Sequence, residues 1–176
     1  MYRAGGRLTL FLHGRRFAMY QIEICSETFP EATADPRLER AATAIFREAL
    51  VDRATLSIAI VDDPTIHGLN RQYLEHDYPT DVLSFLLERD ADSLEGEVIV
   101  SLDTAARRAA EFGWTAADEL LLYVIHGTLH LVGYDDQAEA ARGEMRAAER
   151  RVLAIFGIEP RDAPTPEIPA KAGSGD

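Results

Sequence analysis

Polar and apolar residues alternate in two stretches of the chain, Tyr20–Cys25 and Thr55–Val61. This two-residue period predicts β-strands with one buried face. Two shorter apolar runs, Val82–Leu87 and Gly96–Ser101, have the length of further strands. We expect the one cysteine, Cys25, to be a buried small apolar residue of the first strand.

Between and after these strands, apolar residues recur at the spacing of helices. Helices are predicted to follow the N-cap residues Asp35, Asp63, Asp103 and Thr115, and a last helix is predicted over residues 137–156. The first two caps precede a proline, which suits the first helical position because its missing N–H needs no partner there. This mixed order of elements predicts an α+β fold, in which a small mixed β-sheet is covered by helices.

The helix that follows Thr115 is expected to lie at the centre of the fold, because it is apolar on nearly all sides. His126 and His130 lie four residues apart on it, so their imidazoles share one face. Gly133 suits the left-handed end of the helix, and Asp136 follows three residues later. Two imidazoles and one carboxylate, with an open position for water, are the ligand set of a catalytic zinc site.

The spacing of the two histidines resembles the metzincin zinc signature, in which Glu follows the first His as the general base. Here that position is Gly127, which cannot transfer a proton. The chain therefore keeps the metal ligands of a zinc peptidase and lacks its main catalytic group. This lack makes a metallopeptidase the least favoured function for the chain.

Composition narrows the class of protein. The 176 residues suit one domain, and the hydrophobic content of 47% is that of an ordinary globular protein. No apolar run approaches the roughly 20 residues that span a bilayer, so we expect no membrane contact. One cysteine forms no disulfide within the chain, so nothing requires an oxidising compartment and we expect a cytoplasmic protein. The net charge of −12 disfavours nucleic acid on average, so RNA binding needs a local basic face.

The two ends of the chain differ from the body in composition. Residues 1–18 contain four arginines and no acidic residue, and they are predicted to be a disordered basic extension or an over-long start before Met19. Residues 158–176 are rich in Pro, Ala, Gly and charge, which predicts a disordered tail. A single domain is therefore expected over residues 19–157.

On the last predicted helix, Arg142, Arg146 and Arg150 recur every four residues, with glutamates interspersed. Such a face is typical of a solvated helix with ion pairs. We favour that interpretation over a nucleic-acid footprint.

Several stretches together resemble the YbeY family, the bacterial single-strand-specific endoribonucleases that act in ribosomal RNA maturation. The run His126–Asp135 is similar to the zinc motif of the family, and the glycine at position 127 belongs to that motif. The other family blocks are matched, in the right order, by Leu69-Asn70, Asp77–Phe85 and Gly96–Ser101. The resemblance covers roughly residues 19–157.

Two positions depart from the pattern of the family. Its third zinc ligand is His, whereas this chain has Asp136. A carboxylate also ligates zinc, makes the bound water less acidic through its charge, and admits harder metals such as Mn²⁺ more readily. The family usually has an arginine, thought to help bind substrate phosphate, where this chain has Leu74. Arg71, about one helical turn earlier, is a candidate substitute for substrate binding.

Polar residues before and within the third predicted strand have two interpretations. Thr80, Asp81 and Ser84 either build a polar wall of a site or form a turn with a capped strand end. Asp81, Ser84 and His76 are candidates for lining the site, and none is assigned as a general base. His67 is expected to be an exposed or capping residue rather than a ligand.

The resemblance implies a zinc-dependent endoribonuclease that acts on single-stranded RNA in 16S ribosomal RNA 3′ end maturation and in ribosome quality control. One Zn²⁺ per chain is expected on His126, His130 and Asp136, with RNA and the small ribosomal subunit as partners. The alternative is a ribosome-assembly or RNA-binding factor with a mainly structural metal, which the departures at Leu74 and Asp136 favour.

Overall fold

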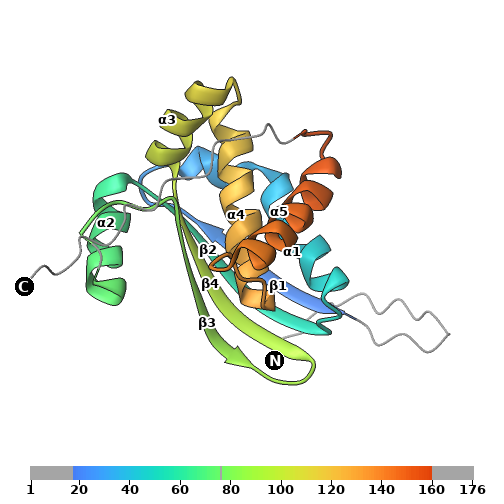
Figure 1. Cartoon of the computed structure of the whole chain (residues 1–176). Coiled ribbons are helices and arrows are strands. Elements are labelled where there is room, and N and C mark those ends of the chain that lie inside the picture. The colour runs from blue at the N-terminus through green and yellow to red at the C-terminus, as the bar shows by residue number, and fades with distance from the viewer. Residues whose placement is uncertain (1–17, 76, 160–176) are drawn as a thin grey trace, which may run out of the picture.

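The computed structural model describes residues 18–75 and 77–159 and contains one four-stranded sheet in that part of the chain (Figure 1). The strands are β1 (Met19–Cys25), β2 (Arg53–Val61), β3 (Val82–Arg89) and β4 (Ser93–Ser101). Their order in the sheet is β1-β2-β4-β3. The strands β1, β2 and β4 are parallel, and β3 runs antiparallel to β4. The predicted α+β class with a small mixed sheet is confirmed.

Helices cover the sheet. They are α1 (Pro36–Glu48), α2 (Asp63–Leu74), α3 (Leu102–Phe112), α4 (Ala116–Val132) and α5 (Glu139–Ala154), with a short 3-10 helix, η1 (Pro30–Ala34). Ile58 and Ile60 of β2 belong to the main core, which α1, α4 and α5 complete. Ala59 and Val61 pack instead with Ile66 of α2. Because successive strand residues point to opposite faces, α2 lies on the other face of the sheet.

The helix α4 is the central element, as its apolar sequence predicts (Figure 1). Ten of its residues are buried, and it contacts β3, β4, α1, α3 and α5. Two glycines allow its close approach to the sheet. A Cβ on Gly127 of α4 would lie 2.7 Å from Val98 Cγ1, and a Cβ on Gly96 of β4 would lie 2.8 Å from Leu131 Cδ1.

Two of the predicted helix caps are confirmed. The side chain of Asp35 accepts a hydrogen bond from the Arg37 N–H, and that of Thr115 accepts one from the Asp118 N–H. Each satisfies a backbone donor that has no partner within its own helix.

The other two predicted caps are wrong by one or two residues. The N-cap of α2 is Asp62 and not Asp63, and the N-cap of α3 is Ser101 and not Asp103. Asp63 instead turns inward and accepts hydrogen bonds from Ser101 and from two residues of α3, Thr104 and Arg107. Burial alone would raise the pKa of Asp63, but these hydrogen bonds outweigh it and lower that pKa. The carboxylate that the local sequence predicted as a helix cap thus forms a tertiary contact between α2 and α3 instead.

The expectation that Cys25 is buried is wrong, because its side chain is exposed. It lies in β1, an edge strand whose alternate residues face away from the covering helices. Several element bounds also differ from the prediction. The strands β1, β2 and β4 begin earlier, at Met19, Arg53 and Ser93, and β3 extends to Arg89. The last helix covers residues 139–154 rather than 137–156.

The two terminal segments predicted to be disordered fall, apart from Ala18, Ile158 and Glu159, outside the described residues. Their disorder and the domain limits at residues 19 and 157 stay predictions. No helix in the described ranges has the length and apolar character needed to cross a membrane.

Candidate metal centre

Both histidines lie in the last two turns of α4, where the local sequence ends the helix. Gly133 is the C-cap with a positive φ of 108°, a conformation that glycine adopts without a Cβ clash. The N–H of Gly133 donates to the His130 carbonyl, and the N–H of Tyr134 donates to the Leu129 carbonyl. The chain then turns back across the end of the helix and brings Asp136 to the two imidazoles.

Three ligand atoms converge at this point. His126 Nε2 and His130 Nε2 are 2.9 Å apart, and Asp136 Oδ2 lies 3.6 Å from the first and 4.0 Å from the second. Ligand atoms that share a tetrahedral zinc, with bonds of about 2.0–2.1 Å, lie about 3.3 Å from one another. These three residues are thus a group that can hold a metal ion. The Asp136 side chain is 42% exposed, so the group opens to solvent on its side.

The neighbouring Asp135 has a different role. Its Oδ1 accepts the backbone N–H groups of Asp136 and Gln137. This carboxylate stabilises the turn that follows α4, while the next carboxylate along the chain faces the histidines. The choice of Asp136 over Asp135 as the candidate ligand therefore has a structural reason.

The other nitrogen of each imidazole is held by an acceptor. His126 Nδ1 lies 2.7 Å from Glu149 Oε1, and His130 Nδ1 lies 3.0 Å from the Tyr134 carbonyl oxygen. A neutral imidazole has one N–H, and these acceptors place it on Nδ1 in both rings. Two Nε2 lone pairs then face each other at 2.9 Å, which is repulsive unless a cation lies between them. The arrangement of acceptors around both rings fits a metal ion.

The electrostatic environment of His126 is negative. Burial by itself lowers the pKa of this imidazole, but the hydrogen bond from Nδ1 to Glu149 and the nearby charges of Asp81 and Asp136 outweigh burial, so the pKa is raised. The same negative charges that favour a proton on the ring also favour a bound cation.

Glu149 is a site residue that sequence reasoning missed. It lies on α5, in the stretch interpreted as a solvated ion-pair face, and its side chain is only 17% exposed. No local spacing indicates it, because only the packing of α5 against α4 brings it to His126. Carboxylate partners of metal-binding histidines fix the ring orientation and raise its basicity.

We therefore expect Glu149→Gln to weaken zinc binding roughly 10- to 100-fold while the three ligand atoms stay in place. The measurement is a competition titration with a chromophoric chelator. Glu144→Gln, a change of the same charge at an exposed position of α5, is the matched control and should leave the affinity unchanged. Equal affinities for the two variants would contradict an orienting role for Glu149.

A second prediction concerns the two adjacent aspartates. Asp136→Asn removes the charged ligand. Its zinc affinity should fall by more than the 10- to 100-fold that is typical when a hydrogen-bond partner of a ligand is lost. Asp135→Asn keeps an oxygen that accepts the two backbone N–H groups, so this variant should retain zinc. Elemental analysis of both proteins distinguishes them, and zinc unchanged in Asp136→Asn would exclude this residue as a ligand.

The polar residues near β3 form the capped turn that was one of the two interpretations given for them. Asp81 Oδ1 accepts from the Val82 N–H and from the Thr80 hydroxyl. The negative charge of Asp81 also contributes to the raised pKa of His126, and a role of these residues as the wall of a site stays a prediction. The Ser84 hydroxyl is buried without a hydrogen-bond partner among the described residues and would lie 2.9 Å from a Cβ at Gly127.

The remaining histidine candidates lie elsewhere. His67 is half-exposed on α2, and its Nε2 lies 2.9 Å from Asp77 Oδ1, which agrees with the expectation that it is no ligand of this group. His76, proposed as a residue lining the site, lies outside the described residues.

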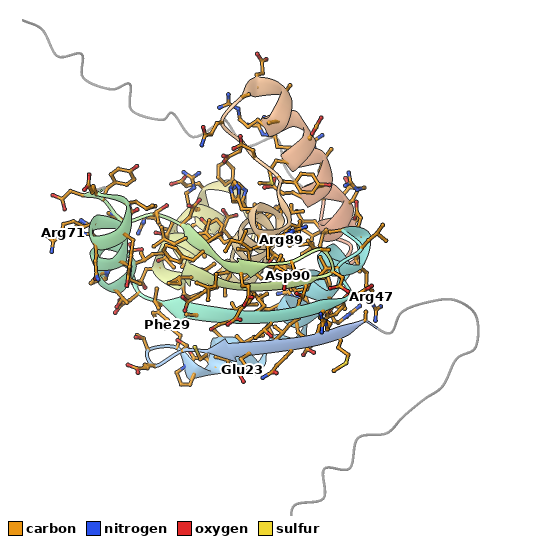
Figure 2. All side chains as sticks on the ribbon, turned by 90° about the horizontal axis from the view of Figure 1, so that it is seen from below. Glu23, Phe29, Arg47, Arg71, Arg89 and Asp90 are labelled. Atoms are coloured by element: carbon orange, nitrogen blue, oxygen red, sulfur yellow. The ribbon has the colours of Figure 1, made fainter. Side chains whose placement is uncertain are left out.

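The two positions discussed for phosphate binding lie on α2. Leu74 is 47% exposed at the last residue of that helix, where an apolar side chain offers no donor. Arg71 is exposed, and Figure 2 shows it on the outer side of α2, directed away from the body of the molecule. The loop between α2 and β3 is anchored by Asn70, a side chain only 1% exposed that donates to the Tyr78 carbonyl.

Comparison with known proteins points to one family. The family model described as Endoribonuclease YbeY matches residues 22–157. A relative named Endoribonuclease YbeY from Rhodopirellula baltica is 46% identical over 129 residues, which are 72% of this chain and 66% of that protein. A relative of the same name from Pelotomaculum thermopropionicum is 42% identical over 69% of this chain and 85% of its own length.

The fold is also similar to a solved structure. The solution structure of TM1509 from Thermotoga maritima superposes with a TM-score of 0.55 at 27% sequence identity, covering 85% of this chain and 99% of that one. The segment matched by the family model includes part of β1, all of β2–β4, α4 with both histidines, and α5 with Glu149. The chain belongs to the YbeY endoribonuclease family.

Proposed function

We propose that this protein is a zinc-dependent endoribonuclease that hydrolyses single-stranded RNA. Its native role would be 16S ribosomal RNA 3′ end maturation and ribosome quality control in the cytoplasm, with the small ribosomal subunit as partner. The observation that carries the proposal is the convergence of His126, His130 and Asp136 in a chain that matches the YbeY family over residues 22–157.

The residues of the chain would hold one Zn²⁺ through the two Nε2 atoms and Asp136 Oδ2. When bound, such an ion supplies Lewis-acid polarisation of a phosphate oxygen and lowers the pKa of a ligated water. Glu149 and the Tyr134 carbonyl hold both rings in the tautomer that directs Nε2 at the ion. The exposed side of Asp136 leaves access for substrate and water.

The absence of a glutamate directly after His126 in the sequence favours RNA hydrolysis over peptide hydrolysis. A zinc peptidase uses Glu at this position as its base. Here Gly127 lies against the sheet, where a longer side chain has no room. The match to the endoribonuclease family favours the phosphodiester bond, for which a bound ion would polarise a phosphate oxygen or activate a water.

Substrate binding must overcome the net charge of −12. Arg71 is the proposed phosphate-binding residue on α2, because Leu74 occupies the position where the family usually has an arginine. We expect the protein to bind free RNA weakly. Binding should be stronger where the ribosome presents the RNA, because contacts with the ribosome raise the effective concentration of the RNA at the site.

The test uses the full chain loaded with zinc and a fluorescent single-stranded RNA oligonucleotide, with the corresponding duplex as control. We expect cleavage of the single strand alone, loss of cleavage in chelator, and recovery when zinc is restored. Cleavage that persists in chelator would refute the metal dependence. Casein incubated with the same zinc-loaded protein should remain intact.

A second function is favoured by one observation, the apolar and exposed Leu74 where a phosphate-binding arginine is usual. Without that arginine, the protein would be a ribosome-assembly or RNA-binding factor whose metal is mainly structural. In that case the RNA oligonucleotide binds and is not cleaved, and removal of zinc lowers the thermal unfolding midpoint.

A further inference from the structure

Ion pairs with carboxylates hold several arginines of the described residues. They join Arg37 to Asp35 and Asp118, Arg53 to Asp92, Arg107 to Asp63, and Arg151 to Glu48. Arg89 differs from these four residues. Within residues 18–75 and 77–159, no carboxylate oxygen is found within 4.0 Å of its guanidinium, and its hydrogen bond goes to a neutral group.

That neutral group belongs to α4, the helix that carries His126 and His130. Arg89 Nη1 donates to the Leu131 carbonyl oxygen at 3.0 Å. The neighbouring carbonyls of Leu129 and His130 already accept the N–H groups of Tyr134 and Gly133. Leu131 directly follows His130, so the guanidinium is fixed at the end of α4 that carries the metal-binding group.

The strand geometry explains how Arg89 reaches this place. It is the last residue of β3, an edge strand, and the register with β4 shifts between Leu86 and Glu88. Such a bulge bends the strand and redirects the side chains that follow it. Figure 2 shows Arg89 towards the middle of the view, whereas Arg71 projects at its margin.

The positive charge of Arg89 therefore stays available for an anion such as a phosphate. A backbone carbonyl at a helix C-terminus stabilises a cation without neutralising it. One of the five N–H donors of the guanidinium is used by Leu131, and the planar fork keeps donors for a phosphate. A side chain that is already held also loses less conformational entropy on binding than a free surface arginine.

We propose that Arg89 binds an RNA phosphate next to the phosphodiester that occupies the metal-binding group, a role that rests on the proposed nuclease function. It supplies a cation at the end of α4 that carries His130, in a chain where Leu74 offers none. The substrate class is single-stranded RNA, because a flexible strand can direct one phosphate at the metal and a neighbouring one at a fixed guanidinium.

The experiment compares Arg89→Ala, Arg89→Lys and Arg53→Ala in the zinc-loaded full chain. Arg53 is exposed and paired with Asp92 at the start of β2, so its removal makes the same change of net charge without touching the hydrogen bond to Leu131. KM for the single-stranded RNA oligonucleotide is measured from about 50 to 200 mM salt. Fluorescence anisotropy of the labelled oligonucleotide gives its binding, and elemental analysis gives the zinc content.

For Arg89→Ala we expect KM and the dissociation constant to rise about tenfold with zinc content unchanged. The slope of log affinity against log salt should fall by about 0.7, the value for one phosphate contact on a single strand. Arg89→Lys should restore the salt slope and part of the affinity, because it keeps the charge and loses the fork. Arg53→Ala should behave as the unmodified protein.

Two outcomes overturn the proposal. One is an unchanged KM, dissociation constant and salt slope in Arg89→Ala. The other is a loss of zinc or thermal stability with an unchanged salt slope at saturating zinc, which would make Arg89 a helix cap only. Failure of the proposed nuclease function looks different, because the unmodified protein would then bind RNA without cleaving it and anisotropy would still report on Arg89.

Discussion

Replacing either His126 or His130 with alanine is expected to abolish zinc binding by the full chain and to reduce RNA hydrolysis at least about 100-fold. Each variant removes one of two Nε2 atoms that lie 2.9 Å apart and leaves a single imidazole with one carboxylate. Two remaining ligands do not make the three-residue set of a catalytic zinc site. Elemental analysis of the purified proteins and the oligonucleotide assay measure the two effects.

The matched control is His67→Ala. This imidazole pairs with Asp77 on the other side of the sheet and belongs to no metal-binding group among residues 18–75 and 77–159. The His67→Ala protein should retain one zinc per chain. Full zinc occupancy in either the His126→Ala or the His130→Ala protein would overturn the ligand assignment.

The fold should survive these substitutions, because both histidines are partly exposed and the core of α4 lies on its other faces. In the His126→Ala protein, the Glu149 carboxylate loses its partner at a site where it is mostly shielded from water. We therefore expect a modest cost in unfolding free energy of about 1–3 kcal/mol, checked by circular dichroism during thermal unfolding.

The second large effect is expected for Gly127→Ala, which should destabilise the protein by about 1–3 kcal/mol or more. A Cβ at this position meets three sheet atoms: Val98 Cγ1 at 2.7 Å, Ser84 Oγ at 2.9 Å and Val82 Cγ2 at 3.0 Å. Two of these atoms belong to β-branched valines, which are stiff at χ1 and cannot easily move aside. The helix must shift outward, and its histidines shift with it.

The consequence for the site should be measurable separately from stability. Because His126 precedes the glycine directly, a displaced α4 changes the distance from its imidazole to Asp136. We expect weaker zinc binding by chelator competition, together with a lower urea midpoint. The control is Gly143→Ala on α5, where a Cβ has no neighbour within 4 Å and replacement of a helical glycine should stabilise by about 0.5–1 kcal/mol. A Gly127→Ala protein as stable as its parent would contradict the packing argument.

This packing also explains why the position cannot hold the base of a zinc peptidase. A glutamate at 127 would have to project into the sheet, between Val82 and Val98. The glycine therefore has a structural cause as well as a chemical consequence. The sequence alone indicated the missing base, and the tertiary structure supplies the reason for its absence.

Local patterns predicted the elements well where local physics controls them. The alternation in Tyr20–Cys25 and Thr55–Val61, the cap at Asp35 and the helix end at Gly133 all appear in the structure as expected. Each depends on neighbours within a few residues, through a hydrogen bond, a backbone conformation or a side-chain period. The candidate ligands on α4 were identified for the same reason, since helical spacing alone places His126 and His130 on one face.

Where distant segments compete for a side chain, local patterns were wrong or incomplete. The carboxylate of Asp63 bonds to α3 and leaves the cap of α2 to Asp62. Cys25 is exposed because β1 is an edge strand, a fact of sheet order rather than of the strand sequence. The sequence around Glu149 is typical of a solvated glutamate, and only the packing of α5 beside α4 brings it to His126.

By itself, the sequence determined the α+β class, the central apolar helix, the two histidines in register and the absence of a peptidase base. Only the tertiary structure decided what the neighbouring Asp135 does, which carboxylate orients His126, and which arginine is held by a carbonyl at the end of α4. The reason is physical. Helix and strand periods are properties of a few consecutive residues, whereas the position of a charge relative to a site depends on how elements far apart in the chain pack together.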